Sequence, residues 1–83
     1  MYFVYVLKSL SDGMHYVGMT GKNIGERLDR HNRGEYRFTK GHRPWKVVYQ
    51  EAVYARSSAV KRERYLKSGV GRHELKKLVG DSN

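Results

Sequence analysis

The feature that most constrains this chain is an apolar run at its start that is followed by a reversal. Residues 2–7 (Tyr-Phe-Val-Tyr-Val-Leu) are almost continuously β-branched or aromatic, and a second short run follows at residues 16–19 (Tyr-Val-Gly-Met). An Asp12-Gly13 pair lies between the two runs and is typical of a tight turn between strands. We therefore predict a β-hairpin.

The register of this hairpin has two alternatives. A two-residue loop pairs Tyr5 with Thr20, and a four-residue loop over residues 10–13 pairs Tyr5 with Gly18. Both registers place Tyr5 and Tyr16 on one face, because side chains alternate along a strand and paired residues share a face. We expect a hairpin that is covered on both sides and central in its sheet, since its other face is also apolar and carries Val4, Val6, Val17 and Met19.

The length and composition limit the classes of protein to consider. A chain of 83 residues is expected to form one domain, residues 1–83, with a single core and a shallow site. The absence of cysteine excludes disulfides and thiolate metal sites. The apolar run 2–7 is far shorter than the ~20 residues of a membrane span, and no signal peptide is visible, so a cytoplasmic location is expected.

The charge is unevenly distributed along the chain. Lysine and arginine number 17 against 8 aspartates and glutamates, which gives a net charge of +9, and every basic residue except Lys8 lies at or after Lys22. This asymmetry favours a polyanionic partner, namely DNA or RNA, because each phosphate that is neutralised releases counterions. The alternative is a surface that is basic only for solubility.

A helix is predicted after the hairpin. Asn23 is a good N-cap for a helix over residues 24–32, with Glu26 at the third helical position, and Gly34 ends it. Ile24 and Leu28 face the core. Arg27 and His31 are four residues apart and lie on a neighbouring stripe, so we expect both to line a cleft.

The segment 34–44 has no periodicity and is predicted to be a loop. Its aromatic residues Tyr36 and Phe38 stand among basic side chains, a composition that suits gripping phosphates and stacking on bases. The alternative is a solvated loop whose aromatic rings pack back on the core. The candidate nucleic-acid-binding residues in and beside this loop are Arg33, Arg37, Lys40, Arg43 and Lys46.

The second half of the chain predicts one strand and two helices. Residues 45–51 alternate as a strand, and Ser57 or Ser58 caps a helix that runs to about Ser68. Gly69 and Gly71 are expected to stop this helix, and a last helix covers residues 72–79. The element order is therefore β-β-α-β-α-α.

Glu63 is the unusual residue of the predicted second helix. It follows Ala59 by four residues and precedes Leu66 by three, which places a carboxylate on the apolar stripe. Such a carboxylate is costly unless it is paired or bound to a metal. The structural explanation is a salt bridge, for example to Arg27. The functional explanation is a ligand for Mg²⁺. The neighbouring cations Lys61, Arg62, Arg64 and Lys67 are expected to point elsewhere.

Together these residues resemble the GIY-YIG nuclease superfamily. The first motif is represented by residues 3–5 (Phe-Val-Tyr) and the second by residues 16–18 (Tyr-Val-Gly), followed by Arg27, His31 and Glu63. The resemblance covers residues 2–79 and is to small stand-alone bacterial members, which are similar to the N-terminal nuclease domain found in the C component of excinuclease ABC. It implies an α+β fold with a small three-stranded antiparallel sheet flanked by helices.

The resemblance also implies a role for each motif residue. Tyr5 and Tyr16 match the two motif tyrosines, one of which helps to deprotonate the attacking water. Arg27 matches the arginine that binds the scissile phosphate, His31 a position that supports the site by hydrogen bonding or proton transfer, and Glu63 the single ligand of a Mg²⁺ or Mn²⁺ ion.

Two departures from the family pattern bear on this assignment. Phe3 and Val4 replace the glycine and isoleucine of the first motif. Many members carry an asparagine after the metal-binding glutamate, and the only asparagine after Glu63 here is Asn83, so His73 or backbone groups are the candidates for its place.

Three functions follow. The first is a metal-dependent DNA endonuclease that acts on branched, distorted or single-stranded DNA in repair or recombination. The second is a nucleic-acid-binding module that keeps the nuclease fold with weak or no cleavage. The third is a protein-interaction subunit of a larger nuclease. The four histidines have no zinc-site spacing, and the glycines form no phosphate-binding loop.

Overall fold

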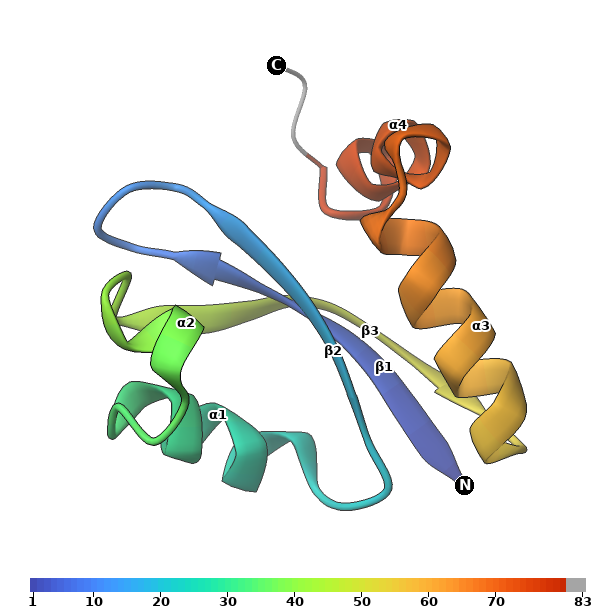
Figure 1. Ribbon diagram of the computed structural model, residues 1–83, viewed down its shortest axis with the longest axis horizontal. Helices are drawn as coiled ribbons and strands as arrows, with labels where there is room; N and C mark the ends of the chain where they lie inside the picture. The colour runs from blue at the N-terminus through green and yellow to red at the C-terminus, as the bar shows by residue number, and fades with distance from the viewer. Residues whose placement is uncertain (81–83) are drawn as a thin grey trace.

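The computed structural model, which describes residues 1–80, has a three-stranded antiparallel sheet with helices on both faces (Figure 1). This confirms the predicted α+β class and the order β-β-α-β-α-α, to which the structure adds one short helix, α2, in the segment predicted as a loop. The elements are β1 (Tyr2–Ser9), β2 (His15–Thr20), α1 (Ile24–Asn32), α2 (Arg37–Lys40), β3 (Trp45–Val53), α3 (Arg56–Lys67) and α4 (Gly69–Leu78).

The hairpin adopts one of its two predicted registers. Tyr5 pairs with Gly18 and Leu7 pairs with Tyr16, which corresponds to the four-residue loop. Gly13 has a φ of +78°, a conformation that glycine adopts at little cost, and its N–H donates to the carbonyl of Ser9. Tyr5 and Tyr16 therefore share a face, as predicted.

The strand order is β2-β1-β3, so β1 is the central strand and β2 lies at an edge. The prediction of a central hairpin is thus right for β1 and wrong for β2. An apolar sequence pattern reports whether the faces of a strand are covered. It does not report on which side of the hairpin the third strand pairs. Here β3 returns to β1, from Tyr2 opposite Val53 to Ser9 opposite Trp45.

The two faces of the sheet carry separate cores. Helices α3 and α4 cover one face, where the buried residues are Val4, Val6, Val17, Ala59, Leu66 and Leu75. Helix α1 covers the other face, where the buried residues are Tyr5, Leu7, Ile24 and Trp45. A bulge in β3 lets it contribute to both cores: Val6 pairs with Tyr49, whereas Leu7 pairs with Val47. Trp45 and Val47 pack on the α1 side, and Val48, Tyr49 and Val53 pack on the α3 side.

The ends of α1 agree with the prediction. The Asn23 side chain accepts a hydrogen bond from the backbone N–H of Glu26 at 3.2 Å, and Gly34, with a φ of +80°, follows the last turn.

The starts of α3 and α4 differ from the prediction, whereas their last residues agree with it to within one position. Helix α3 begins at Arg56 with Ala55 at its N-cap, and it ends at Ser68, whose hydroxyl accepts the N–H of Gly71 and caps α4. Gly69 and Gly71 therefore lie inside α4 and do not stop α3. A Cβ at Gly71 would come within 1.8 Å of the Tyr65 carbonyl oxygen, so this glycine is there for the close approach of two helices.

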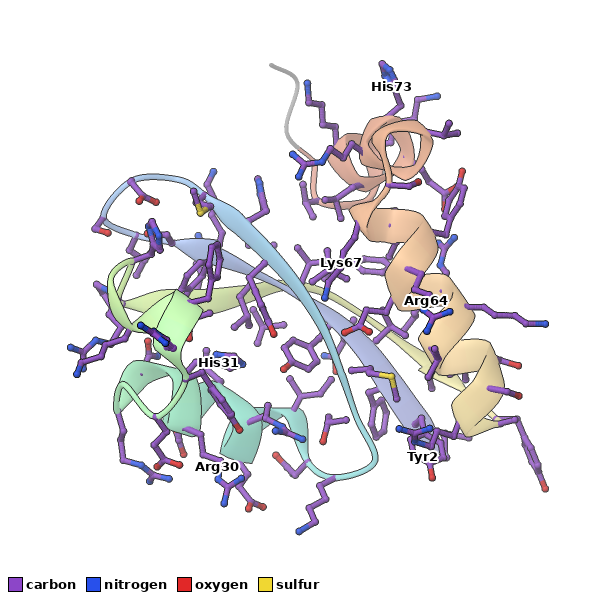
Figure 2. All side chains as sticks on the ribbon, viewed as in Figure 1. Tyr2, Arg30, His31, Arg64, Lys67 and His73 are labelled. Carbon is purple, nitrogen blue, oxygen red and sulfur yellow. The ribbon has the colours of Figure 1, made fainter. Side chains whose placement is uncertain are left out.

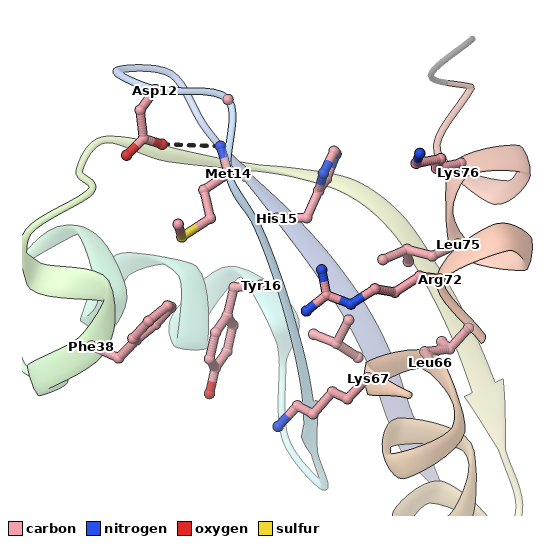
Figure 3. Close-up of a pocket in the computed structure, with 12 residues that line it drawn as sticks. Asp12, Met14, His15, Tyr16, Phe38, Leu66, Lys67, Arg72, Leu75 and Lys76 are labelled. Carbon is pink, nitrogen blue, oxygen red and sulfur yellow. Dashed lines mark hydrogen bonds between the residues drawn. The ribbon is translucent and has the colours of Figure 1, made fainter. Parts of the chain in front are cut away.

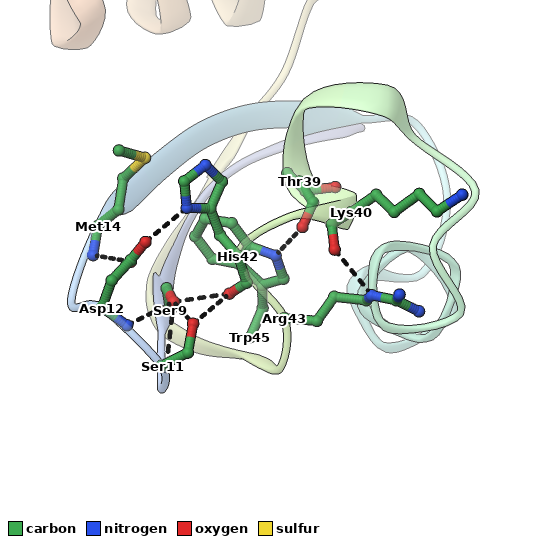
Figure 4. A network of polar contacts seen from close by, with 9 residues as sticks. All are labelled: Ser9, Ser11, Asp12, Met14, Thr39, Lys40, His42, Arg43 and Trp45. Atoms are coloured by element: carbon green, nitrogen blue, oxygen red, sulfur yellow. Dashed lines mark hydrogen bonds and ion pairs between the residues drawn. The ribbon is translucent and has the colours of Figure 1, made fainter.

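Polar contacts fasten the hairpin turn to the segment before β3 (Figure 4). The Ser9 hydroxyl donates to the carbonyl of His42 at 2.6 Å, and the imidazole of His42 contacts the Asp12 carboxylate at 2.5 Å. The hydrogen bond from the Met14 N–H and the contact with His42 lower the pKa of Asp12 to about 2. Trp45 adds a hydrogen bond from its indole N–H to the carbonyl of Thr39.

Within residues 1–80, none of the helices has both the length and the apolar character that crossing a membrane would need.

Candidate active site

A buried hydrogen-bonded chain joins β1, α1 and α2. The Tyr5 hydroxyl lies 3.2 Å from Nε2 of His31, and Nδ1 of the same ring lies 2.8 Å from the Thr39 hydroxyl. All three residues are at most 2% exposed. His31 was predicted to line a cleft, and this prediction is wrong: α2, which the sequence pattern did not predict, supplies Thr39 and covers the ring.

His31 is electrically neutral near pH 7. Burial first, and the charge of Arg27 second, lower the pKa of His31 to about 4. A neutral imidazole has one donor and one acceptor nitrogen, so a phenol that donates to Nε2 leaves Nδ1–H to donate to Thr39. The residue therefore holds Tyr5 in place by hydrogen bonding and adds no positive charge to the site.

Gly18 provides the space for Tyr5 on the edge strand. A Cβ at this position would lie 2.6 Å from both Cζ and the hydroxyl oxygen of Tyr5. Because the two residues are direct partners across the hairpin, the phenol ring extends over β2 at the one motif position that has no side chain. The motif glycine thus determines where the phenol group ends.

Tyr36 is a site residue that sequence analysis placed only in the basic loop. Nη1 of Arg27 donates to the Tyr36 hydroxyl at 2.7 Å, and the Tyr36 ring lies 4.4 Å from the His31 ring. Burial alone would raise the pKa of Tyr36, but hydrogen bonds from Arg27 and Arg30 outweigh it and lower the pKa. The signal in the sequence was an aromatic residue among cations. Its partner could not be known before α2 was placed.

The two motif tyrosines have raised pKa values. Burial is the main cause of the raised pKa of each tyrosine. The second cause is electrostatic repulsion, from Tyr16 in the case of Tyr5 and from Glu63 in the case of Tyr16. Arg27 acts in the opposite direction on both residues. Both phenols are therefore protonated at neutral pH. Tyr5 is 2% exposed, whereas Tyr16 is only half-buried, so Tyr16 is the one of the two that solvent and a substrate can reach more easily.

Glu63 extends from α3 toward these tyrosines. Its side chain is 22% exposed, and its ion pair is with Nζ of Lys67 at 3.5 Å, one helical turn away. A salt bridge to Arg27 was the structural explanation, and Lys67 takes that place. Lys67 was also expected to point elsewhere, but its ammonium lies 5.6 Å from the centre of the Tyr16 ring (Figure 3). The i, i+4 geometry of the helix brings the two side chains together.

These side chains meet at the free edge of β2. Tyr5 and Tyr16 belong to the face that α1 covers, whereas Glu63 and Lys67 come from α3 on the other face. Lys67 nevertheless contacts Tyr16, and Glu63 raises the pKa of both tyrosines. Only an edge strand allows groups from both faces of a sheet to approach each other. The five residues predicted as catalytic therefore gather in one place from four elements: Tyr5, Tyr16, Arg27, His31 and Glu63.

His73, the side-chain candidate for the place of the missing asparagine, does not join this cluster. His73 is exposed on α4 and points away from the sheet (Figure 2). Asn83 lies outside the described residues.

The predicted nucleic-acid-binding residues are all exposed, and they lie directly after α1, on α2, between α2 and β3, and at the start of β3. Two of them also bind within the protein. Nε of Arg33 is 2.8 Å from the Glu35 carboxylate, and Nε of Arg43 donates to the carbonyl of Lys40 at 2.9 Å. The others, Arg37, Lys40 and Lys46, are available to a ligand, and their role stays a prediction.

The fold and this cluster define the class of the protein. The family of the GIY-YIG catalytic domain matches residues 1–77, so the chain belongs to that family and has its nuclease fold.

Relatives from two organisms place it more closely among the UPF0213 proteins. A UPF0213 protein of Staphylococcus aureus strain Mu3 is 40% identical over 76 residues, which is 90% of each chain, and the UPF0213 protein of strain Mu50 matches equally well. The solution NMR structure of a UPF0213 protein from Bacillus halodurans aligns with a TM-score of 0.57 at 28% identity, over 99% of this chain and 89% of that one.

Proposed function

We propose that this protein is a divalent-metal-dependent endonuclease that hydrolyses phosphodiester bonds of branched, distorted or single-stranded DNA. The observation that carries the proposal is the meeting of two phenols, a guanidinium and a carboxylate at the edge of β2. Nucleases with this domain bind nucleic acid and typically use a divalent metal. A role in repair or recombination accords with the predicted substrates, and the expected products are a 5′-phosphate and a 3′-hydroxyl.

Arg27 is the proposed phosphate-binding residue. Its guanidinium is held by the Tyr36 hydroxyl at 2.7 Å and is partly exposed. A guanidinium in a set orientation can donate two hydrogen bonds to a phosphate, and it stabilises the negative charge that develops as water attacks phosphorus. Tyr36 is a positioning residue in this scheme, because it acts through Arg27.

Glu63 is the proposed metal ligand because its carboxylate is a hard oxygen donor. Within residues 1–80 no group of three or more histidine, aspartate or glutamate side chains could hold a metal ion, so Glu63 would be the single acidic ligand. Mg²⁺ is commonly held by one or two carboxylates together with waters and substrate phosphate. The contact between Glu63 and the half-exposed Lys67 is weak enough to be displaced, since ion pairs between residues i and i+4 of a helix contribute only about 0.3–0.5 kcal/mol. When bound, Mg²⁺ or Mn²⁺ neutralises charge on the phosphate oxygens.

Tyr16 is the better placed of the two tyrosines to orient the attacking water. A phenol with a raised pKa is a poor base, so removal of a proton from water requires a cation beside the phenol. Lys67 lies against the Tyr16 ring, and Arg27 lowers the pKa of this phenol. Tyr5 is held by its hydrogen bond to His31 and forms the buried side of the site.

A specific observation favours a second function. The Glu63 carboxylate is already engaged by Lys67, as it would be in a nucleic-acid-binding module that needs no metal. Under this alternative the charge of +9 provides the affinity for nucleic acid and cleavage is weak or absent.

The test compares wild type, Glu63→Gln and the control variant Glu35→Gln, which removes the same charge from an exposed site on the other side of the sheet. Each is incubated with labelled single-stranded, duplex, flap and four-way-junction DNA in Mg²⁺, in Mn²⁺ and with a chelator. We expect Glu63→Gln to lose cleavage by about 100-fold or more, with its DNA affinity within about twofold of wild type because one peripheral charge contributes little.

Two outcomes contradict the nuclease. If wild type binds the panel with a steep salt dependence but cuts none of it, the binding module takes its place. If Glu63→Gln cuts as fast as Glu35→Gln, the carboxylate holds no catalytic ion.

A further inference from the structure

A groove of about 710 Å³ opens directly beside Tyr16, and the site described above does not use it (Figure 3). It lies between the hairpin turn with β2 on one side and the end of α3 with α4 on the other. Tyr16 and Lys67 belong both to this groove and to the tyrosine–glutamate cluster. A ligand in the groove would therefore be continuous with whatever occupies the cluster.

The two walls of the groove have different chemistry. The helical wall carries Arg72 and Lys76, which are both exposed and are four residues apart on α4, so they project from the same face of that helix. The opposite wall carries Met14 and Phe38, of which 40% and 56% are exposed. Asp12 lines its upper end, where its carboxylate is engaged by the Met14 N–H and the imidazole of His42. A cationic wall facing an apolar one suits a ligand with alternating anionic and flat apolar groups.

Phe38 has the character of a stacking surface. Its ring lies 6.1 Å from that of Tyr16, inclined by 31°, and 5.4 Å from that of His42, so it is held on two sides while more than half of it faces solvent. Exposed aromatic rings beside cations bind unpaired bases, because each base offers a flat face. A base inside a duplex is covered by its neighbours and cannot stack in this way.

We propose that the groove binds an unpaired nucleic-acid strand that continues from the scissile phosphodiester, with a base on Phe38 and phosphates on Arg72 and Lys76. The proposal rests on the proposed function for the position of the scissile bond. It narrows the substrate to DNA with a single-stranded segment next to the cut, such as a flap or an overhang. Charge complementarity selects this occupant over an apolar peptide or a second copy of the chain.

The experiment measures binding without cleavage, in a Glu63→Gln background. Fluorescence anisotropy gives the Kd for a labelled duplex with a single-stranded extension of about ten nucleotides and for the same duplex with blunt ends. The groove variant is Arg72→Gln with Lys76→Gln. Its control is Lys61→Gln with Arg64→Gln, which removes the same charge from exposed positions of α3 that do not line the groove.

We expect the groove variant to weaken binding of the extended DNA about tenfold and to reduce the slope of log Kd against log salt concentration by about 1.4, the loss of two contacts to a single strand. Phe38→Leu, which keeps an apolar side chain, should weaken binding of the extended DNA by about fivefold or more and leave the affinity for the blunt duplex unchanged. The control pair should affect both DNAs equally and less strongly.

Equal losses in the groove and control variants, or equal losses for extended and blunt DNA, overturn the proposal. The proposal is also overturned if the groove variant changes the sedimentation of the protein and leaves the Kd for DNA unchanged. The groove would then be a contact between copies of the chain. The binding measurements do not depend on cleavage. If the groove variants behave as expected but the wild-type protein cuts no DNA, only the proposed nuclease function is refuted. A wild type that cuts while its groove variant keeps full affinity for extended DNA refutes only the groove.

Discussion

The two faces of the sheet differ in what they bury. The face under α3 and α4 is built from aliphatic side chains, with Val4, Val6 and Leu66 fully buried. The face under α1 and α2 also buries polar groups, since His31 and Thr39 are as inaccessible as the aliphatic core and are satisfied by hydrogen bonds to each other and to Tyr5. One face is held together by hydrophobic contact, and the other positions functional groups.

This difference shows how a small chain can hold a site and remain folded. Buried polar groups stabilise little even when they are satisfied, and they are costly when one partner is lost. The aliphatic face can supply the stability because its buried side chains have no polar atoms to satisfy. The groups that carry chemistry are then placed at the edge of β2, where both faces supply side chains and solvent can enter.

The largest effect is expected on the aliphatic face. Leu66 is fully buried, and Leu66→Ala should lower the free energy of unfolding by about 2–5 kcal/mol, from lost burial and a residual cavity. Urea unfolding measures this loss. The emission of Trp45, the single tryptophan, which is buried on the other face, should be unchanged in the folded variant. Leu10→Ala is the control, because Leu10 is 57% exposed. A shifted native emission would show that the faces are not packed independently.

A somewhat smaller effect is expected from pH on the polar face. With a pKa of about 4 in the folded chain against about 6.5 in the unfolded chain, His31 binds a proton more readily when unfolded. The stability is then greatest above about pH 6.5 and falls as the pH decreases toward 4, by about 2–3 kcal/mol between pH 7.5 and 4.5. Urea unfolding at the two pH values measures it.

The control for this prediction is His31→Asn, which retains hydrogen-bonding groups but does not titrate. Its stability is lower throughout, and the pH-dependent part should disappear. The pH range lies above both the pKa of Asp12 in the folded chain, about 2, and its unfolded value of about 3.9, so that carboxylate adds little to the slope. An unchanged slope in His31→Asn would assign the pH dependence to other groups.

The smallest change in stability is expected where the faces meet. In Gly18→Ala the new methyl group would come within 2.6 Å of the Tyr5 ring, which is buried and cannot swing away, so we expect a loss of about 1–3 kcal/mol. The hydrogen bond between Tyr5 and His31 should break, and cleavage should fall far more than stability. Thermal unfolding and the cleavage assay give the two numbers.

Gly41→Ala is the matched substitution for this prediction, because a Cβ there meets nothing within 4 Å. It should be neutral or slightly stabilising. If Gly18→Ala cleaves DNA as well as Gly41→Ala does, the position of the Tyr5 phenol is not important for the reaction.

Much of the fold follows from local patterns in the sequence. The β-branched run, the Asp-Gly turn and the Asn23 cap are governed by interactions within a few residues, so strands β1 and β2 and helix α1 could be predicted. The predicted catalytic residues follow from the same patterns together with the family motifs, and the structure brings those residues together.

The remaining features depend on contacts between residues that are distant in the chain. The edge position of β2 depends on which strand β3 pairs with, and the burial of His31 depends on α2, a helix of four residues with no periodicity to detect. The same holds for the contact of Tyr36 with Arg27 and for the close approach of α4 at Gly71. The local sequence determined the elements and their chemistry. Only the tertiary structure decided which groups are buried, which are paired and which face the edge of the sheet, because those properties depend on packing partners that no local pattern specifies.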